Sequence, residues 1–435
     1  MKMNVLVLGS GGREHAITWA ISRSPDVGRI FCAPGNPGMA KLATLLPLSI
    51  EDHDGVMKAV RAHRIDLTVV GPEVPLAAGV VDEFQKNGML IFGPTRDASE
   101  LEWSKSFAKA FMARHAIPTA AYKVFTAQQE AEAGQYVHQC APPYVVKADG
   151  LAAGKGVVIC PSEPEARQVI HEFLAGSVVG NAGATVVVEE FLTGEEASVF
   201  AVSDGERYML LAPAQDHKRA LDGDLGNNTG GMGAYAPAPC VTPAILKRVE
   251  QEVIMPTLRG MTAEGRPYRG CLYVGLMLTS SGPKVVEYNC RFGDPETQVV
   301  LPVYDGDFLT LLAESSAGRL SEGTLRKSWT SSSSAAVCVV LASGGYPGKY
   351  ASGFPIEGLD VIDRRDGLLV FHAGTALKGD CIVTAGGRVL GITAIEPTGN
   401  LRGAIEAAYR AIGDISFSGM HFRKDIGARG LRWSR

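Results

Sequence analysis

The sequence lacks the features of several classes of protein. Its eight cysteines form no Cys-x-x-Cys pair, and most lie in apolar runs such as AAVCVVLA, which predicts buried, reduced thiols. No apolar run approaches the roughly 20 residues of a membrane span, and the run at the start is too short for a signal peptide. The net charge of −4 indicates no overall basic surface for nucleic acid. We therefore expect a cytoplasmic protein that binds neither membranes nor nucleic acid.

Glycine, in contrast, is abundant, with 51 of 435 residues against a usual share of about 7%. The glycines gather in short runs without an internal repeat, which is typical of loops where the backbone approaches a ligand closely. The hydrophobic share (46%) and the charged share (20%) are those of an ordinary globular protein. The length favours about three domains.

Short apolar strands alternate with helical stretches over the first hundred residues. The strands are expected at 4–9, 29–33, 66–71 and 89–93, and the helices at 13–23, 54–63 and 76–87. This alternation predicts βαβ units and a doubly wound parallel sheet over residues 1–103. In such sheets, ligands bind beyond the carboxyl ends of the strands.

The middle of the chain is expected to form an α+β region over residues 104–325. One amphipathic helix, DASELEWSKSFAKAFMARH, starts before this region, leads into it and ends before Pro118. A small α+β unit follows over 121–192 and a larger one over 193–325. The chain as a whole is therefore expected to be a multidomain α/β and α+β protein.

The last part of the chain is expected to be a small α+β domain over residues 326–435. The run TSSSS at 330–334 is the best linker candidate before its strands. Because this domain shows no cluster of titratable groups, we expect it to support the others. The basic tail RKDIGARGLRWSR is expected to be solvated surface.

The first loop, GSGGREHA, lacks the third glycine of a dinucleotide-binding turn, because Glu14 stands at that position. The second strand also lacks the acidic residue that would hold a ribose of NAD. The loop still offers free backbone N–H groups at a helix start, with Arg13 beside them, which suits a single phosphate group. The alternative is a tight strand-to-helix turn without a ligand.

The stretch VVKADGLAAGKGVVI is not a Walker A motif, because it has three residues between its glycines and Gly156 in place of Ser or Thr. A glycine loop between two antiparallel strands, with Lys147 before it, can instead cover nucleotide phosphates. Lys147 stands in an apolar run, so it needs an anionic partner if it faces inward. The alternative is an exposed face of the strand.

Two further segments are rich in charge. In TVVVEEFLTGEEAS, Glu189 and Glu190 follow four β-branched residues and precede Gly194, which predicts a hinge beside a nucleotide or a simple surface pair. Residues 214–235 read as a long polar loop with four glycines from 226 to 233, in which Asp216 and Lys218 lie close together. Such loops are usually lids over a substrate or disordered segments.

The stretch KVVEYNCRFGDPETQ begins as a strand but places Glu287, Asn289 and Arg291 at alternate positions, and so on one face. A carboxylate and a carboxamide are oxygen ligands that suit Mg²⁺ held jointly with phosphates. Arg291 can reach a transferring phosphoryl group or an acyl phosphate. The alternative is the solvated face of a half-buried strand.

Ten segments stand in order from residue 9 to residue 427: GSGGREHA, PGNPG, VGPEVPL, IFGPT, KADGLAAGKGV, EEFLTGEEAS, QDHKR, NTGGMGAY, EYNCRFGDPE and RKDIG. Together they resemble the phosphoribosylamine–glycine ligase family of ATP-grasp enzymes. The resemblance implies ATP-dependent ligation of glycine to 5-phosphoribosylamine through glycyl phosphate, giving glycinamide ribonucleotide, ADP and phosphate in purine biosynthesis. ATP with Mg²⁺ or Mn²⁺ is the implied cofactor set, and we expect a monomer.

The resemblance also implies roles for individual residues. ATP would be bound by Lys105, Lys147, Gly150, Gly154, Lys155 and Gly156 at its phosphates, by Glu189, Glu190, Phe191 and Leu192 at adenine, and by Glu196 at its ribose. The metal ligands would be Glu287 and Asn289. Catalysis would involve Arg291, Lys147, Asp216 and Asp294, the last two at the glycine ammonium. The remaining substrate contacts would come from Gly11, Gly12 and Arg13 (phosphate), Glu73 (ribose hydroxyls) and Lys218.

Two positions depart from the family pattern. Asn227 stands where the lid motif has proline, and Met277 stands where many ATP-grasp relatives have a carboxylate one strand before the Glu–Asn pair. Rival interpretations are another ATP-grasp carboxylate–amine ligase and a biotin-dependent carboxylase, although the chain has no Met-Lys-Met biotinyl segment. A nucleotide-sensing protein without catalysis would be expected to lack the lid cations or the Glu–Asn pair.

Overall fold

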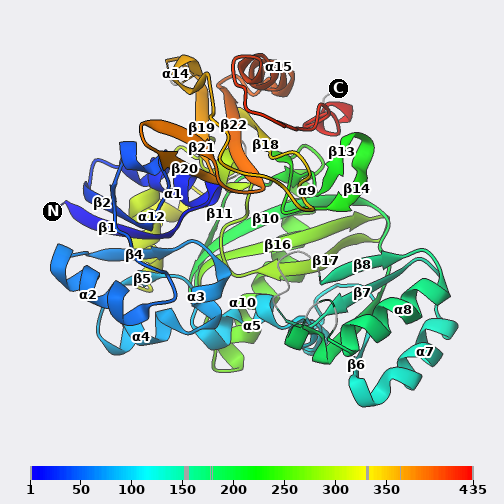
Figure 1. Cartoon of the computed structure of the whole chain (residues 1–435). Helices are drawn as coiled ribbons and strands as arrows, with labels where there is room; N and C mark the ends of the chain where they lie inside the picture. Colours follow the sequence, from blue (N-terminus) through cyan, green and yellow to red (C-terminus); the bar gives the residue numbers. More distant parts are fainter. Residues whose placement is uncertain are drawn as a thin grey trace.

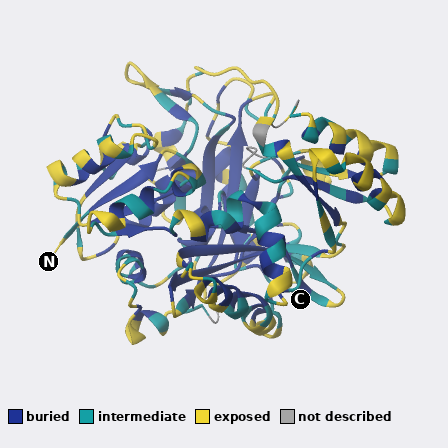
Figure 2. Cartoon of the chain, turned by 90° about the horizontal axis from the view of Figure 1, so that it is seen from below, coloured by how far each residue is buried: buried dark blue, intermediate teal, exposed yellow. Residues whose placement is uncertain are grey.

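The structure is a computed structural model that describes residues 2–150, 156–176, 178, 180–329, 333–362 and 364–433. Figure 1 shows an N-terminal region, a central region made of two sheets, and a C-terminal region with the long helix α15 on its outer side. Figure 2 shows the strands of the sheets buried, while many of the surrounding helices expose one side. The expected multidomain α/β and α+β fold is confirmed.

The N-terminal region contains a parallel sheet of order β3-β2-β1-β4-β5. Its elements are β1 (Met3–Gly9), α1 (Gly12–Ser22), β2 (Val27–Pro34), β3 (Thr44–Leu45), α2 (His53–His63), β4 (Leu67–Val70), α3 (Glu73–Ala77), α4 (Val80–Lys86) and β5 (Ile91–Phe92). The doubly wound sheet was predicted. The single helix expected over 76–87 is instead two, because Gly79 breaks it with a φ of +86°.

Two helices, and not the one expected, lead into the central region. They are α5 (Arg96–Trp103) and α6 (Lys105–Arg114). Between them Ser104 has extended backbone, with φ −124° and ψ 107°, and its hydroxyl caps α6 by accepting from Phe107 N at 3.1 Å. Asp149 accepts from Ser106 N at 2.6 Å, which joins the start of α6 to the end of a strand in the next unit.

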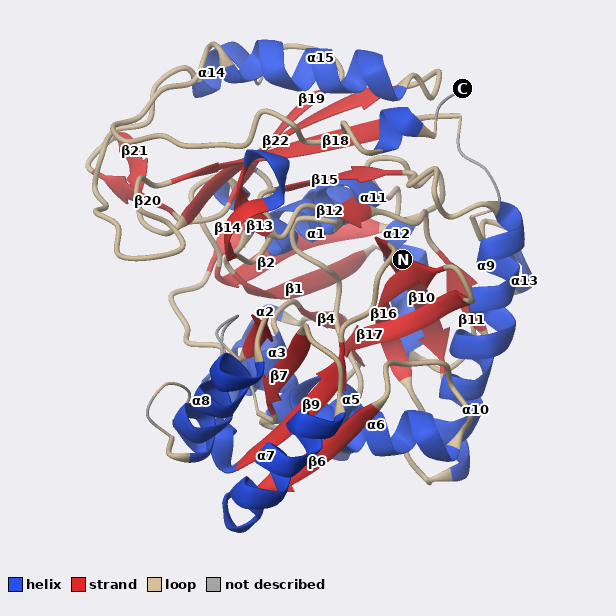
Figure 3. Cartoon of the chain, turned by 90° about the vertical axis from the view of Figure 1, so that its right-hand side faces the viewer, coloured by secondary structure: helices blue, strands red, loops and turns tan. Residues whose placement is uncertain are grey.

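The first sheet of the central region is antiparallel, with the order β6-β9-β7-β8. Its elements are β6 (Tyr122–Thr126), α7 (Glu130–Gln139), β7 (Tyr144–Ala148), β8 (Val157–Cys160), α8 (Glu163–Leu174) and β9 (Thr185–Glu190). Phe125, Val146 and Phe173 belong to a core that this unit keeps to itself. It forms the lower end of the molecule in Figure 3.

The second sheet of the central region has the order β11-β10-β16-β17. Its elements are β10 (Glu195–Asp204), β11 (Tyr208–Leu210), α9 (Pro243–Val249), a π-helical turn (Glu250–Ile254), α10 (Met255–Ala263), β16 (Arg269–Thr279), β17 (Gly282–Asn289), α11 (Thr297–Val300), α12 (Phe308–Ser316) and α13 (Glu322–Leu325). Val199 and Val274 share a core with Leu258 of α10, whereas Phe200 and Tyr273 share a core with Phe308 of α12. The two faces of this sheet therefore pack against different helices.

The C-terminal sheet takes two of its five strands from the segment that was expected to be a long loop. Its order is β12-β15-β18-β22-β19 (Figure 3). The elements are β12 (Gln215–Asp216), β13 (Arg219–Leu221), β14 (Leu225–Asn228), β15 (Gly233–Ala236), β18 (Ala335–Ala342), α14 (Leu359–Ile362), β19 (Leu368–His372), β20 (Thr375–Lys378), β21 (Cys381–Thr384), β22 (Arg388–Glu396) and α15 (Leu401–Ile412). The loop prediction for residues 214–235 is therefore wrong. The segment is built into the sheet and into the β13–β14 hairpin.

All eight cysteines are free. Cys140 is half-buried and Cys381 is exposed, while the other six are buried, as their apolar surroundings predicted. Among the residues that the structure describes, no helix has both the length and the apolar character needed to cross a membrane.

Candidate active site

Three adjacent strands of the second central sheet present polar side chains on one face. Cross-strand partners in a sheet point to the same side. Tyr273 of β16 pairs with Asn289 of β17, and Gly275 pairs with Glu287. Ser198 of β10 pairs with Gly275 from the other side. Glu287 and Asn289 therefore share one face, as their alternation predicted, and Ser198 and Tyr273 join them there.

Met277 stands opposite neither Glu287 nor Asn289. Met277 pairs with Lys284, because the register of β16 and β17 shifts after Gly275. The residue opposite Asn289 is Tyr273. The interpretation of Met277 as the position of the missing carboxylate is therefore wrong.

Glu287 carries its charge next to a lysine. Lys218 Nζ lies 3.3 Å from Glu287 Oε1 and 3.4 Å from Glu196 Oε2. Lys218 lowers the pKa of Glu287 to about 2 against the opposing effect of burial, so the carboxylate is ionised at every working pH. Burial opposes the charge of Lys218, yet Glu196 and Glu287 raise its pKa well above the usual range.

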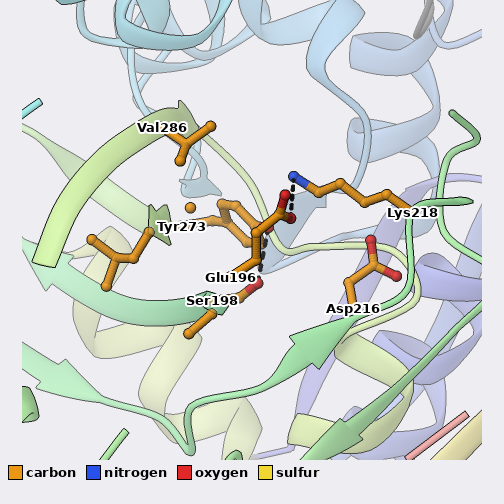
Figure 4. A pocket seen from close by; sticks show the side chains of 9 residues that line it. Glu196, Ser198, Asp216, Lys218, Tyr273 and Val286 are labelled. Carbon is orange, nitrogen blue, oxygen red and sulfur yellow. Dashed lines mark hydrogen bonds and ion pairs between the residues drawn. The ribbon is translucent and has the colours of Figure 1, made fainter. Parts of the chain in front are cut away.

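A small cavity opens beside this ion pair. Its walls are Glu196, Ala197, Ser198, Asp216, Lys218, Tyr273, Gly275, Leu276 and Val286. Figure 4 shows Asp216 and Lys218 on one side of it, across from Glu196, Ser198 and Tyr273. The cavity thus brings together three of the predicted site residues, Glu196, Asp216 and Lys218.

Lys147 faces inward and has the anionic partner that this position requires. Its Nζ lies 2.9 Å from Glu189 Oε1 and donates to Val286 O at 3.1 Å. Lys109, which sequence reasoning missed, lies 2.8 Å from Glu189 Oε2. Burial lowers the pKa of Lys109 to about 8 although Glu189 opposes the shift. The Glu189 carboxylate therefore forms ion pairs with two buried lysines. Glu189 is one of the residues at which adenine was expected.

The other residues expected at ATP surround this lysine pair. Lys105 Nζ donates to Gly150 O at 3.1 Å, and burial lowers the pKa of Lys105. Glu190 lies 2.9 Å from Lys284 Nζ. Phe191 is exposed, Leu192 is half-buried, and Gly156 O accepts from Ala148 N. Gly154 and Lys155 lie outside the described residues.

Arg291 lies between two carboxylates at the junction with the N-terminal region. Its Nη2 is 3.0 Å from Glu102 Oε1, and its Nε is 3.4 Å from Glu73 Oε2. Glu102, which sequence reasoning missed, also accepts from Cys290 N at 2.6 Å. Burial raises the pKa of Glu102 against the effect of Arg291. For Glu73, the nearby Arg291 and Arg13 outweigh burial and lower the pKa.

The first glycine loop is occupied by a side chain of its own helix. Gly11 N donates to Glu14 Oε2 at 2.6 Å, and Arg13 Nε lies 2.5 Å from Glu14 Oε1. Arg13 is buried and also donates to Phe292 O at 3.3 Å. A Cβ at Gly71 would lie 2.3 Å from Glu14 Oε1, so the glycine there leaves room for the carboxylate. The expectation of a free N–H group at Gly11 is therefore wrong.

The C-terminal domain reaches the site through Arg388. Arg388 Nη2 lies 2.9 Å from Asp294 Oδ2, and its Nη1 donates to Asp294 O at 2.7 Å and to Gly230 O at 2.5 Å. Gly230 N in turn donates to Tyr346 Oη at 3.1 Å. A Cβ at Gly231 would lie 2.4 Å from Pro295 Cδ. The glycine turn therefore packs tightly against the turn at Pro295, between β17 and α11.

The basic tail is buried at its start, which contradicts its interpretation as solvated surface. The Arg423 side chain is only 1% exposed, and it contacts Asp425 at 2.7 Å and Asp224 at 2.9 Å. These contacts hold the β13–β14 hairpin, on which the exposed Asn227 lies. Arg429 donates to Asp216 O at 2.6 Å. The tail thus supports the segment that carries Asp216 and Lys218.

Family models match the chain in three consecutive parts. The N domain of phosphoribosylglycinamide synthetase matches residues 3–102, its ATP-grasp (A) domain matches residues 103–297, and its C domain matches residues 336–429. The relatives include the phosphoribosylamine–glycine ligase of Chlorobaculum tepidum, which is 50% identical over 433 residues and covers 99% of this chain and 100% of its own. That of Pseudomonas aeruginosa is 50% identical over 435 residues, covering 100% and 99%.

Solved structures agree with these matches. Phosphoribosylamine–glycine ligase from Thermotoga maritima is 35% identical, with a TM-score of 0.83, and covers 97% of this chain and 100% of its own. The biotin carboxylase domain of 2-oxoglutarate carboxylase from Hydrogenobacter thermophilus covers 97% and 92% with a TM-score of 0.72 but is only 17% identical, so it shows the ATP-grasp fold alone. The chain belongs to the phosphoribosylamine–glycine ligase family of ATP-grasp enzymes.

Proposed function

We propose that this enzyme uses ATP to join glycine to 5-phosphoribosylamine, which gives glycinamide ribonucleotide, ADP and phosphate. The supporting observation is the sheet face that carries Glu287 and Asn289, with Lys218 3.3 Å from Glu287 and a small cavity beside them. An ionised carboxylate, a carboxamide and a lysine close together suit the charges of a nucleoside triphosphate and its metal. The names of the relatives with about 50% identity supply the two substrates.

The ligation requires an activated carboxyl group, because hydroxide is a poor leaving group in water. We propose glycyl phosphate as the intermediate. A carboxylate oxygen of glycine attacks the γ-phosphorus of ATP, the bond to the β-phosphate oxygen breaks, and ADP leaves. The ribosylamine nitrogen then attacks the glycyl carbon, the carbon–oxygen bond to phosphate breaks, and the nitrogen loses a proton. A half-buried arginine such as Arg291 suits the charge of the acyl phosphate.

The residues on the sheet face fit a divalent metal. Glu287 and Asn289 offer two oxygen donors on one side of β17. The low pKa of Glu287 keeps its carboxylate ionised, as binding to a metal requires. Bound Mg²⁺ or Mn²⁺ would supply charge neutralisation between neighbouring phosphates. Lys105 and Lys147 lie near the described ends of the glycine loop, so they suit the phosphates, with Glu196 at the ribose of ATP.

Adenine and the second substrate are assigned by position. We place adenine at the turn of Glu190, Phe191 and Leu192, since the Glu189 side chain is taken by two lysines. The ribosylamine belongs at the strand ends of the N-terminal region, where Glu73 lies beside Arg291. Contact between its phosphate and Gly11, Gly12 or Arg13 requires Glu14 to release the Gly11 amide.

The proposal is tested by ADP release with each component omitted in turn. We expect ADP only when ATP, Mg²⁺, glycine and 5-phosphoribosylamine are all present, because the acyl phosphate is consumed by the amine. Serine and alanine in place of glycine are the controls for the acid, and ammonia is the control for the amine. Equal ADP release with other amino acids, or release that depends on bicarbonate instead of glycine, would contradict the assignment.

A further inference from the structure

Two buried lysines share the carboxylate of Glu189, but their contacts with it differ. Lys109 Nζ lies 2.8 Å from Glu189 Oε2 and forms a hydrogen bond with the carboxylate. Lys147 Nζ lies 2.9 Å from Glu189 Oε1, yet among the described residues this oxygen has no partner with hydrogen-bond geometry. All three residues are at most 5% exposed. The Lys109 contact is therefore a directed hydrogen bond, whereas the Lys147 contact is an ion pair that lacks this geometry.

Both lysines are also tied to the backbone of β17. Lys109 Nζ donates to Thr119 Oγ1 at 2.8 Å, and this hydroxyl donates to Val285 O at 2.7 Å. Lys147 Nζ donates directly to Val286 O at 3.1 Å. An ammonium group has three protons to donate, so the threonine hydroxyl and the carboxylate together take two of those on Lys109. Lys109 is therefore held firmly from two sides.

Lys147 is the lysine on the side of the predicted metal ligands. The pKa of Glu287 is lowered first by Lys218, and Lys147 adds to this effect against that of burial. Lys109 points elsewhere, because its Nζ lies 5.7 Å from the centroid of the Tyr122 ring. A phosphate group that approaches Glu287 with its metal would therefore come close to Lys147.

The charges of this cluster do not balance. Two ammonium groups and one carboxylate leave one positive charge in excess in a buried place. Glu190, the next carboxylate along β9, is paired with Lys284 at 2.9 Å. An excess buried cation is unfavourable until an anion joins it. A nucleotide phosphate would supply that anion, and Lys147 is the lysine whose contact with Glu189 is easier to exchange.

We infer that Lys109 is a positioning residue for ATP, which keeps the Glu189 carboxylate neutralised so that Lys147 can bind the nucleotide phosphates. Without Lys109, a turn of Lys147 toward a phosphate would leave the buried Glu189 carboxylate without its hydrogen-bonded cation, which is strongly unfavourable. Lys109 does not touch the nucleotide in this arrangement and acts only through Glu189. The inference rests on the proposed function in taking ATP as the nucleotide.

The test is the Kd for ATP with Mg²⁺, measured by titration calorimetry on the full chain without glycine or 5-phosphoribosylamine. Lys109→Met should raise this Kd by about 10-fold or more, because Glu189 then holds Lys147 as its only cation. The KM for ATP should rise likewise, while kcat and the KM for glycine change less than about threefold. The double variant Lys109→Met/Glu189→Gln should recover most of the ATP affinity, because a neutral amide no longer holds Lys147 by charge.

Lys123→Met is the matched control. Lys123 is an exposed residue on β6, which pairs with β9, and its Nζ lies over the rings of Phe125 and Tyr136. Its loss removes one positive charge from the same small unit. Because exposed charges are screened by salt, the Kd for ATP should change less than about twofold.

An unchanged Kd for ATP in Lys109→Met would overturn the inference. A double variant that binds ATP no better than Lys109→Met would also overturn it, since packing at Lys109 and not the charge of Glu189 would then explain the loss. Both variants should unfold cooperatively on heating without ATP, because the first keeps the Glu189–Lys147 pair and the second has no buried carboxylate to leave unpaired. A wild type that binds ATP but releases ADP only with bicarbonate would instead refute the proposed function and leave the role of Lys109 intact.

Discussion

Glu287→Ala is expected to lower ATP-dependent turnover by more than about 10²-fold, the order of loss found when one preorganised charge-stabilising group is removed. Glu287 is one of two oxygen donors on its face of β17, and its low pKa means that it is always charged. The fold should persist, since the side chain is 39% exposed and Lys218 keeps Glu196 as a partner. Turnover measured across a Mg²⁺ titration, with thermal unfolding alongside, checks both parts.

Glu252→Ala provides a matched control for this substitution. Glu252 is 35% exposed and pairs with one cation, Arg248, on a helix away from the cavity. Its loss should leave the Mg²⁺ dependence unchanged, because a surface ion pair contributes only about 0–1 kcal/mol. If Glu287→Ala keeps its Mg²⁺-dependent turnover, the assignment of Glu287 as a metal ligand is wrong.

Arg291→Met is expected to have the largest effect on stability. The substitution leaves Glu102, and in part Glu73, buried without the guanidinium that now lies 3.0 Å and 3.4 Å away. Removing one partner of a buried ion pair typically costs about 3–5 kcal/mol. Activity should fall as well, because Arg291 is the cation that we propose for the acyl phosphate. Urea unfolding and ADP release measure the two effects separately.

The stability loss in Arg291→Met should depend on pH. Burial already raises the pKa of Glu102 with Arg291 in place, and without the guanidinium the pKa rises further. The folded state then binds this proton more tightly than the unfolded chain, so the free energy of unfolding falls as pH rises. The deficit relative to the wild type should therefore be smaller at about pH 5 than at about pH 8.

Two further variants make this prediction decisive. Adding Glu102→Gln to Arg291→Met should restore part of the lost stability, because it removes the unpaired charge without changing the shape. Arg365→Met, at an exposed pair with Asp414, should cost little at either pH. A deficit that is equal at both pH values and unaffected by Glu102→Gln would show that packing, and not charge, explains the loss.

Much of the fold could be predicted because its pattern is local. The N-terminal strands are short apolar runs between helical stretches, and such alternation depends only on near neighbours. Strands β12 and β14 escaped prediction because Gln215–Asp216 and Leu225–Asn228 have no apolar alternation, and they are strands only through their partners. The break at Ser104 was missed because the helical period continues across it.

The site was predictable where its residues are neighbours in sequence. Glu287, Asn289 and Arg291 lie within five positions, so strand geometry alone places the first two together. Glu102 and Arg388 were missed because they meet Arg291 and Asp294 only through tertiary structure, 189 and 94 positions apart along the chain. A lone acidic or basic residue in a helix or strand carries no local signal of such a partner.

The C-terminal sheet makes the order of synthesis matter. Strand β15 leaves the ribosome about a hundred residues before β18, its neighbour in that sheet. Until the last quarter of the chain emerges, one side of β15 is a bare strand edge, of the kind that recruits other chains into aggregates. Newly made protein therefore remains vulnerable until its final domain arrives, and a chain that stopped short of β18 would keep that edge open permanently.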